Sequence, residues 1–274
     1  MSFPILKKYL ARLSDASGAA SSIWLDHEGK AHGRFFNCTL SSAFQPIRQL
    51  ASGEVRAYEG LARSVSAQDQ GLSLWRLLDH AASDDESIEL DRLCRMLHAI
   101  NFFRQAGDGP QDLYLNVHDR LLSAVSSNHG HAFRRILDAL ELPLQRVVLQ
   151  LPAASPQQGW LLNYVSDNYR RNGFRFAVNV PSAREGLLLL DRLRPDVLKL
   201  DARELQDSEA LLALLKRSAQ DHVALVFKRL ESTPALTVLR QLGEAADVPL
   251  LVQGYMLDEP RADLLSTERE VVAA

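Results

Sequence analysis

The stretch "AFQPIRQLASGEVRAYEG" spans residues 43–60 and sets the pattern for the rest of the chain. Two strand-like segments flank Ser52 and Gly53, a pair of residues typical of a turn, so the stretch predicts an antiparallel hairpin. Its second segment leads to a glutamate, Glu59, which is followed by Gly60 and Leu61. A carboxylate at the end of an apolar strand is a candidate for chemistry rather than for packing.

Short apolar runs recur downstream of this hairpin and alternate with helical patterns. They are "LYLNV" (113–117), "RVVLQL" (146–151), "FRFAVNV" (174–180), "DVLKLD" (196–201), "VALVFK" (223–228) and "PLLVQG" (249–254). Their spacing is roughly 22 to 34 residues, the length of one strand–helix unit, and continuous apolar runs suit parallel strands covered on both faces. Helices are expected over 72–82 and 87–103. The pattern predicts an α/β fold, a β/α barrel; a doubly wound open sheet is the alternative, because the sequence does not show closure.

The first 39 residues predict an extension to this barrel. Apolar residues at helical spacing indicate an amphipathic helix over 4–13, followed by a Ser- and Ala-rich linker at 14–22. A turn signal at Glu28 and Gly29 then predicts a hairpin. We expect residues 1–39 to pack on a barrel formed by 40–274, and the alternative for the helix is a membrane surface or a protein partner.

Composition excludes several classes of protein. The 274 residues are 46% hydrophobic and 24% charged, enough for a full core. A net charge of −3 provides no global attraction for DNA. Cys38 and Cys94 lack a metal-binding spacing, and no uncharged apolar run reaches about 18 residues. We expect a cytoplasmic protein without a membrane segment or direct contact with DNA.

Each predicted strand ends in polar residues. They are Glu59, Asn116, Gln150, Asn179, Lys199 with Asp201, Lys228 and Gln253. Active sites of β/α barrels gather where the strands end, so together these side chains predict a polar pocket at one face of the barrel.

The same segments carry a resemblance to a known family. "FQPIRQLASGEVRAYEGLAR", "LYLNVHDRLL", "VVLQLP", "FRFAVNV", "RPDVLKLD", "FKRLES" and "LVQGYMLDEP" follow one another as in the EAL domain, whose active members linearise the bacterial second messenger cyclic di-GMP. The chain resembles this family over roughly residues 40–262, as expected for a single domain of this size. The resemblance implies a TIM-like (β/α)8 barrel with one antiparallel strand.

The resemblance also implies roles for individual residues. Glu59 stands at the signature glutamate, a metal ligand, and Asn116 at an asparagine ligand. Lys199 stands at the lysine associated with the attacking water. The resemblance places Gln45, Pro46 and Arg63 at positions that line the dinucleotide site. Gln253 stands at the glutamine of the last strand, and Glu231 at a glutamate that braces a functional loop.

Several carboxylates of the family pattern are replaced in this chain. Gln150 stands at a ligand glutamate, Asn179 and Val180 at paired aspartates, and Lys228 at another glutamate. The formal charges of the remaining acids, Glu59 and Asp201, are cancelled by those of Lys199 and Lys228. Mg²⁺ and Mn²⁺ need oxygen ligands with carboxylates among them, so the pattern predicts no bound metal. Lys228 is expected to pair with Glu59 or to point into solvent.

These substitutions favour a regulatory domain without catalytic activity. We expect it to act either by binding a bacterial regulatory protein or by sensing cyclic di-GMP, for which Arg63, Lys199 and Lys228 are available. The chain is too short for the sensor or cyclase domains usual in the family, which favours the protein partner, and family analogy suggests a homodimer. The alternative is a weak cyclic di-GMP phosphodiesterase in which Glu59, Asn116 and Asp201 hold one Mg²⁺ or Mn²⁺ ion.

Overall fold

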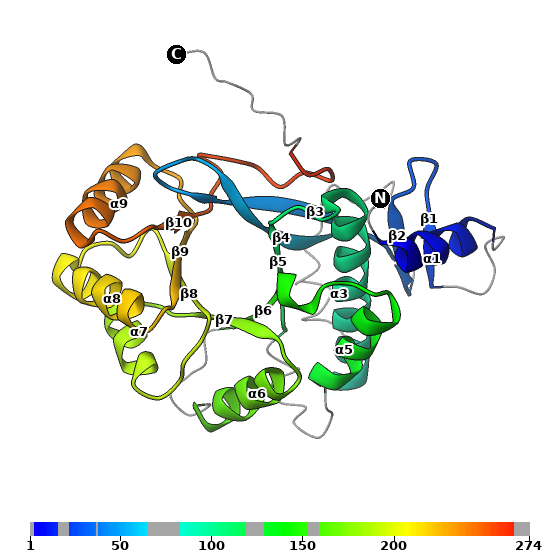
Figure 1. The fold of residues 1–274 in the computed structure, drawn as a ribbon, viewed down its shortest axis with the longest axis horizontal. Helices are drawn as coiled ribbons and strands as arrows, with labels where there is room; N and C mark the ends of the chain where they lie inside the picture. Colours follow the sequence, from blue (N-terminus) through cyan, green and yellow to red (C-terminus); the bar gives the residue numbers. More distant parts are fainter. Residues whose placement is uncertain are drawn as a thin grey trace, which may run out of the picture.

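Eight strands form a closed barrel with helices on its outside (Figure 1). The computed structural model describes residues 3–15, 22–36, 38–64, 83–118, 129–152 and 159–265. The strand order around the barrel is β3-β10-β9-β8-β7-β6-β5-β4, and a further pairing of β3 with β4 closes it. The barrel is therefore confirmed, and the open sheet is excluded.

One barrel strand runs against all the others. The hairpin strands are β3 (Cys38–Gln49) and β4 (Val55–Ser64), and β3 is antiparallel to both β4 and β10. The remaining strands are parallel to β4: β5 (Asp112–Asn116), β6 (Val147–Leu151), β7 (Arg175–Asn179), β8 (Val197–Asp201), β9 (Ala224–Lys228) and β10 (Leu251–Val252). The antiparallel strand predicted from the resemblance is β3.

The described helices pack around this ring of strands. They are α3 (Asp84–Ala106), α5 (His129–Ala139), α6 (Gly159–Arg171), α7 (Ala183–Leu190), α8 (Ser208–Gln220) and α9 (Thr233–Ala246), with a 3-10 turn, η1, at Leu144–Arg146. Ser83 begins α3 with a capping box, in which its hydroxyl accepts from the backbone N–H of Glu86 and the Glu86 carboxylate accepts from the backbone N–H of Ser83. The helix predicted over 72–82 lies outside the described residues. No described helix is long and apolar enough to cross a membrane.

Two apolar clusters stabilise the barrel. The larger lies between strands and helices, and the smaller fills the barrel interior with Ile47, Ala57, Tyr114, Val148, Ala177, Val197 and Val226. The interior is therefore a packed core rather than a pore, as is usual in β/α barrels. Polar side chains are left to gather at the strand ends.

The N-terminal extension packs on the barrel as predicted. Its helix α1 (Pro4–Asp15) buries Leu6 and Leu10, and Phe3 meets Phe103 of α3 edge to face at 5.4 Å between ring centroids. The hairpin of β1 (Ile23–Leu25) and β2 (Ala31–Phe35) pairs with the start of β3. A division of the chain at residues 39 and 40 stays a prediction.

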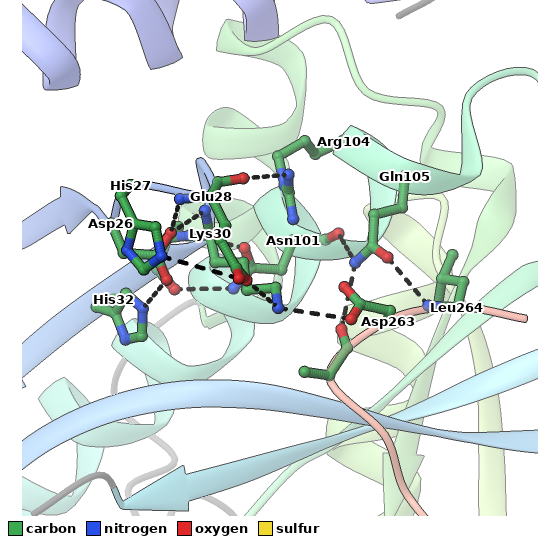
Figure 2. Close-up of polar contacts among 12 residues, drawn as sticks. Asp26, His27, Glu28, Lys30, His32, Asn101, Arg104, Gln105, Asp263 and Leu264 are labelled. Carbon is green, nitrogen blue, oxygen red and sulfur yellow. Dashed lines mark hydrogen bonds and ion pairs between the residues drawn. The ribbon is translucent and has the colours of Figure 1, made fainter.

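Polar contacts of α3 hold this hairpin and the C-terminal segment together (Figure 2). The amide of Asn101 binds both backbone groups of Ala31, accepting from N–H and donating to C=O at 2.8 Å each. Gln105 accepts from the backbone N–H of Leu264 at 3.0 Å. Lys30, between β1 and β2, forms an ion pair with Asp263 at 3.5 Å. The N-terminal hairpin, α3 and the segment around Asp263 therefore meet at this point.

Candidate functional site

Strand geometry brings the predicted polar residues to one end of the barrel. Glu59 lies on β4, opposite Gln45 of β3, while Asn116 and Gln150 are neighbours on β5 and β6. Asn179 on β7 lies beside Lys199 on β8. The carboxyl ends of parallel strands point the same way, and this is why residues far apart in sequence converge here.

Glu59 is the centre of a hydrogen-bonded cluster. Its Oε1 accepts from Nδ2 of Asn116 at 2.8 Å, and its Oε2 accepts from Nζ of Lys199 and Nε2 of Gln253, both at 2.8 Å. Burial alone would raise the pKa of Glu59, but the Lys199 ammonium and these hydrogen bonds outweigh it and lower the pKa to about 2. Glu59 is therefore ionised at neutral pH.

Lys199 is enclosed by oxygen acceptors from three strand ends. Besides Glu59, its Nζ donates to Oε1 of Gln150 at 2.5 Å and to Oε1 of Gln253 at 3.1 Å. The Nζ of Lys199 lies over the ring of Tyr114, 5.6 Å from the ring centroid, and the Lys199 side chain is only 1% exposed. An ammonium has three N–H donors, so all of them are used within the protein. A ligand could contact Lys199 only by displacing one of these acceptors.

Lys228 does not pair with Glu59, so that prediction is wrong. Its Nζ donates instead to Oδ1 of Asn179 at 2.6 Å. The side chain is partly buried rather than extended into solvent, which also rules out the alternative. Lys199 lies on the neighbouring strand and already holds the Glu59 carboxylate, so a second ammonium beside it would be repelled.

Asp201 is held by two arginines. Arg203 contacts both of its carboxylate oxygens at 2.9 and 2.7 Å, and Arg229 reaches it at 3.1 Å. The hydrogen bond from Arg203 is the main reason why the pKa of Asp201 falls to about 2. Arg203 was not among the predicted residues, although an arginine two residues after a strand-end aspartate is a local signal for this contact.

Three further predicted residues lie outside the Glu59 cluster. Arg63 is exposed and donates to the carbonyl of Ala62, and Glu231 is exposed in the loop after β9. Pro46 is buried on the outer face of β3, because neighbours along a strand point to opposite faces and Ile47 faces the barrel interior. The prediction that Pro46 lines the pocket therefore does not fit the strand geometry.

Gln45 and Gln253 connect the cluster to the segment that follows the final strand, β10. Nε2 of Gln253 donates to Oε1 of Gln45 at 3.0 Å, and Nε2 of Gln45 donates to the carbonyl of Asp258 at 2.9 Å. The Asp258 carboxylate is held in turn by Arg48 at 2.6 and 2.8 Å. Arg48 and Asp258 were not among the predicted residues, because no local pattern joins positions so distant in the chain.

A buried histidine explains the glycine after Glu59. A Cβ at Gly60 would lie 3.0 Å from the His98 side chain, tighter than ordinary contact. His98 in turn lies 2.8 Å from the Ser42 hydroxyl through its Nδ1. Burial, with a smaller contribution from Arg63, lowers the pKa of His98 to about 3, so the ring is neutral. The position after the glutamate is therefore small because α3 packs against it.

The acceptor oxygens of the site and its less enclosed ammonium lie on different strands. Glu59, Asn116 and Gln150 present side-chain oxygens, while Lys228 presents an ammonium. Among the described residues, no group of three or more His, Cys, Asp or Glu side chains could hold a metal ion.

Comparison with known proteins yields a family and a set of similar folds. The model of the EAL domain matches residues 31–260. A search of curated proteins finds no match. The solved structures include YkuI of Bacillus subtilis, a protein with an EAL domain, in complex with the substrate c-di-GMP and calcium; it is 22% identical, with a TM-score of 0.68 over 85% of this chain and 58% of that one.

Two further solved structures are similar. A manganese and c-di-GMP complex of Klebsiella pneumoniae BlrP1 is 20% identical, with a TM-score of 0.69 over 82% of this chain and 57% of that one. The PaMucR phosphodiesterase in complex with c-di-GMP is 17% identical, with a TM-score of 0.65 over 81% of this chain and 92% of that one. This chain thus spans less than three fifths of YkuI and BlrP1.

Two expectations from the sequence are wrong in light of these comparisons. The expected absence of enzymatic activity is contradicted by the match to the EAL domain and by the similarity to PaMucR, which is a phosphodiesterase. The absence of a metal cofactor is contradicted by similar structures that contain calcium or manganese together with c-di-GMP.

Proposed function

Because this chain belongs to the EAL domain family, we propose that it binds cyclic di-GMP at the carboxyl ends of the barrel strands and hydrolyses it slowly with a divalent cation. The observation that carries the proposal is the convergence on Glu59 of β4 of polar side chains from β5, β8 and the end of β10. Ligands of β/α barrels bind at this end of the strands. An ionised, nearly enclosed carboxylate here is better suited to chemistry than to packing.

The low rate follows from the arrangement around Lys199. Oxygens of Glu59, Asn116 and Gln150 are the type that Mg²⁺ and Mn²⁺ prefer, but only one of the three groups is charged. As placed, they do not fit a divalent cation, because the Lys199 ammonium lies among them and is bound to Glu59 and Gln150. These residues could hold the ion only after the ammonium moved aside.

Other residues of this end of the barrel are proposed to contact the nucleotide. Gln45 and Gln253 place amide groups beside Glu59, and the exposed Arg63 lies farther along the same face of β4. Guanidinium and amide groups suit phosphates and purine edges. Glu231 is proposed to stabilise the loop after β9 in which it lies. The regulatory protein partner and the homodimer stay predictions from the sequence.

The direct test is a hydrolysis assay on the purified protein. Cyclic di-GMP is incubated with Mn²⁺, with Mg²⁺ and with a chelator, and the linear dinucleotide is separated and quantified. We expect linear product with a metal and none with the chelator. Binding is measured in parallel by calorimetry. The proposal fails if millimolar metal yields no product and the nucleotide does not bind.

Restoring one carboxylate sharpens this test. Gln150→Glu adds a negative charge beside Asn116 and Lys199, so it should raise Mn²⁺ affinity and increase turnover at least several-fold. Gln220→Glu makes the same change at an exposed position on α8 and should leave both unchanged. A folded Gln150→Glu protein that neither binds Mn²⁺ more tightly nor turns over faster would contradict the assignment of these donors.

A further inference from the structure

Lys228 differs from three other cations near the strand ends, Lys199, Arg203 and Arg229, in having no acidic partner among the described residues. Lys199 is paired with Glu59, and Arg203 and Arg229 share Asp201. Lys228 has a neutral acceptor, Oδ1 of Asn179, and no described acidic side chain forms an ion pair with it. The end of β9 therefore carries an ammonium whose charge is not compensated by a direct partner.

Asn179 determines where this ammonium points. Its Nδ2 donates to the carbonyl of Leu151 at 2.9 Å, which turns its Oδ1 toward Lys228. One of the three N–H donors of Lys228 is used by this contact, and no other described residue accepts from the remaining two, which a ligand could use. The side chain is partly buried, so an incoming group would meet a preformed donor rather than a freely moving one.

The surroundings of Lys228 favour an anion. Burial lowers the pKa of Lys228, and the nearby positive charges of Lys199 and Arg229 lower it further, outweighing Glu59 and Asp201. A partly buried cation without a counter-charge is electrostatically costly, and a bound anion would remove that cost. A phosphodiester carries one negative charge and accepts charge-assisted hydrogen bonds from ammonium groups.

We propose that Lys228, positioned by Asn179, binds a phosphodiester oxygen of cyclic di-GMP. This inference rests on the proposed function and adds a specific cationic contact to it. In this arrangement a fixed ammonium neutralises one phosphate, while Glu59 stays paired with Lys199. Nucleotide binding should accordingly not depend wholly on a divalent ion.

The test is calorimetric titration of cyclic di-GMP and of inorganic phosphate, each with chelator and with Mn²⁺. Lys228→Met should weaken cyclic di-GMP binding about 10- to 100-fold, the range for a charge-assisted hydrogen bond, and reduce its salt dependence. Lys228→Arg should stay within a few-fold of wild type. Asn179→Asp supplies a competing carboxylate and should weaken binding as well. Lys216→Met, an exposed position on α8, is the matched control.

The possible outcomes separate this inference from the proposed function. Equal cyclic di-GMP affinity in wild type and Lys228→Met overturns the inference and leaves the function intact. If the wild type binds no cyclic di-GMP, the proposed function fails. In that case phosphate binding that is lost only in the Lys228 and Asn179 variants supports the anion site, and equal or absent phosphate binding overturns it.

Discussion

The ion pair between Glu59 and Lys199 should contribute strongly to stability. The two side chains are 13% and 1% exposed, so water screens their attraction little. Glu59→Gln keeps the shape of the side chain but removes its charge, and it leaves the Lys199 ammonium buried among neutral acceptors. We therefore expect this substitution to lower the free energy of unfolding much more than a surface change does.

The magnitude follows from the pKa of Glu59. Folding lowers it from 4.5 to about 2. At about 1.4 kcal/mol per pKa unit, the folded environment stabilises the ionised carboxylate by about 3 kcal/mol at pH 7. Removing one partner of a buried pair costs about 3–5 kcal/mol, which agrees. Because the pKa is lowered, this stabilisation is complete above pH 4.5 and is lost as the pH falls toward 2. The deficit of Glu59→Gln should shrink to about 1 kcal/mol at pH 3.

Urea unfolding followed by circular dichroism at pH 7 and pH 3 measures this difference. Arg217→Met is the control, because its ion pairs with Asp191 and Asp221 lie at the surface, where solvent screens them, and should contribute little to stability. The double variant Glu59→Gln, Lys199→Met removes both charges and should be closer to wild type than either single variant. A deficit below about 1 kcal/mol at pH 7, or one that stays constant down to pH 3, would refute the reasoning.

Two further predictions concern α3. Gly60→Ala places a Cβ 3.0 Å from His98 and should lower the free energy of unfolding by about 1–3 kcal/mol in urea unfolding. Gly159→Ala, whose Cβ would meet no heavy atom of the described residues within 4 Å, is the control, and equal effects would contradict the clash. Asn101→Ala leaves both backbone groups of Ala31 without their amide partner, so amide hydrogen exchange in β2 should accelerate about 10-fold or more while that in β8 does not. Unchanged exchange in β2 would show that the hairpin is held by other contacts.

Much of the fold could be predicted because its signals are local. The turn at Ser52 and Gly53 marks the hairpin, and strand–helix alternation marks the parallel units. The outward direction of Pro46 could also have been predicted, because side chains alternate along a strand and its neighbour Gln45 points inward. By contrast, closure of the barrel depends on β3 pairing with both β4 and β10, whose contacts span most of the chain.

The sequence by itself determined which polar residues would share one end of the barrel, because strand period and strand direction are local properties. It did not determine how they pair. Whether Lys199 or Lys228 takes the Glu59 carboxylate depends on the relative positions of β4, β8 and β9 to within an ångström or so, and an ion pair excludes its competitor by charge repulsion. Only the tertiary structure therefore decided that Lys199 is enclosed and that Lys228 stands beside a neutral amide.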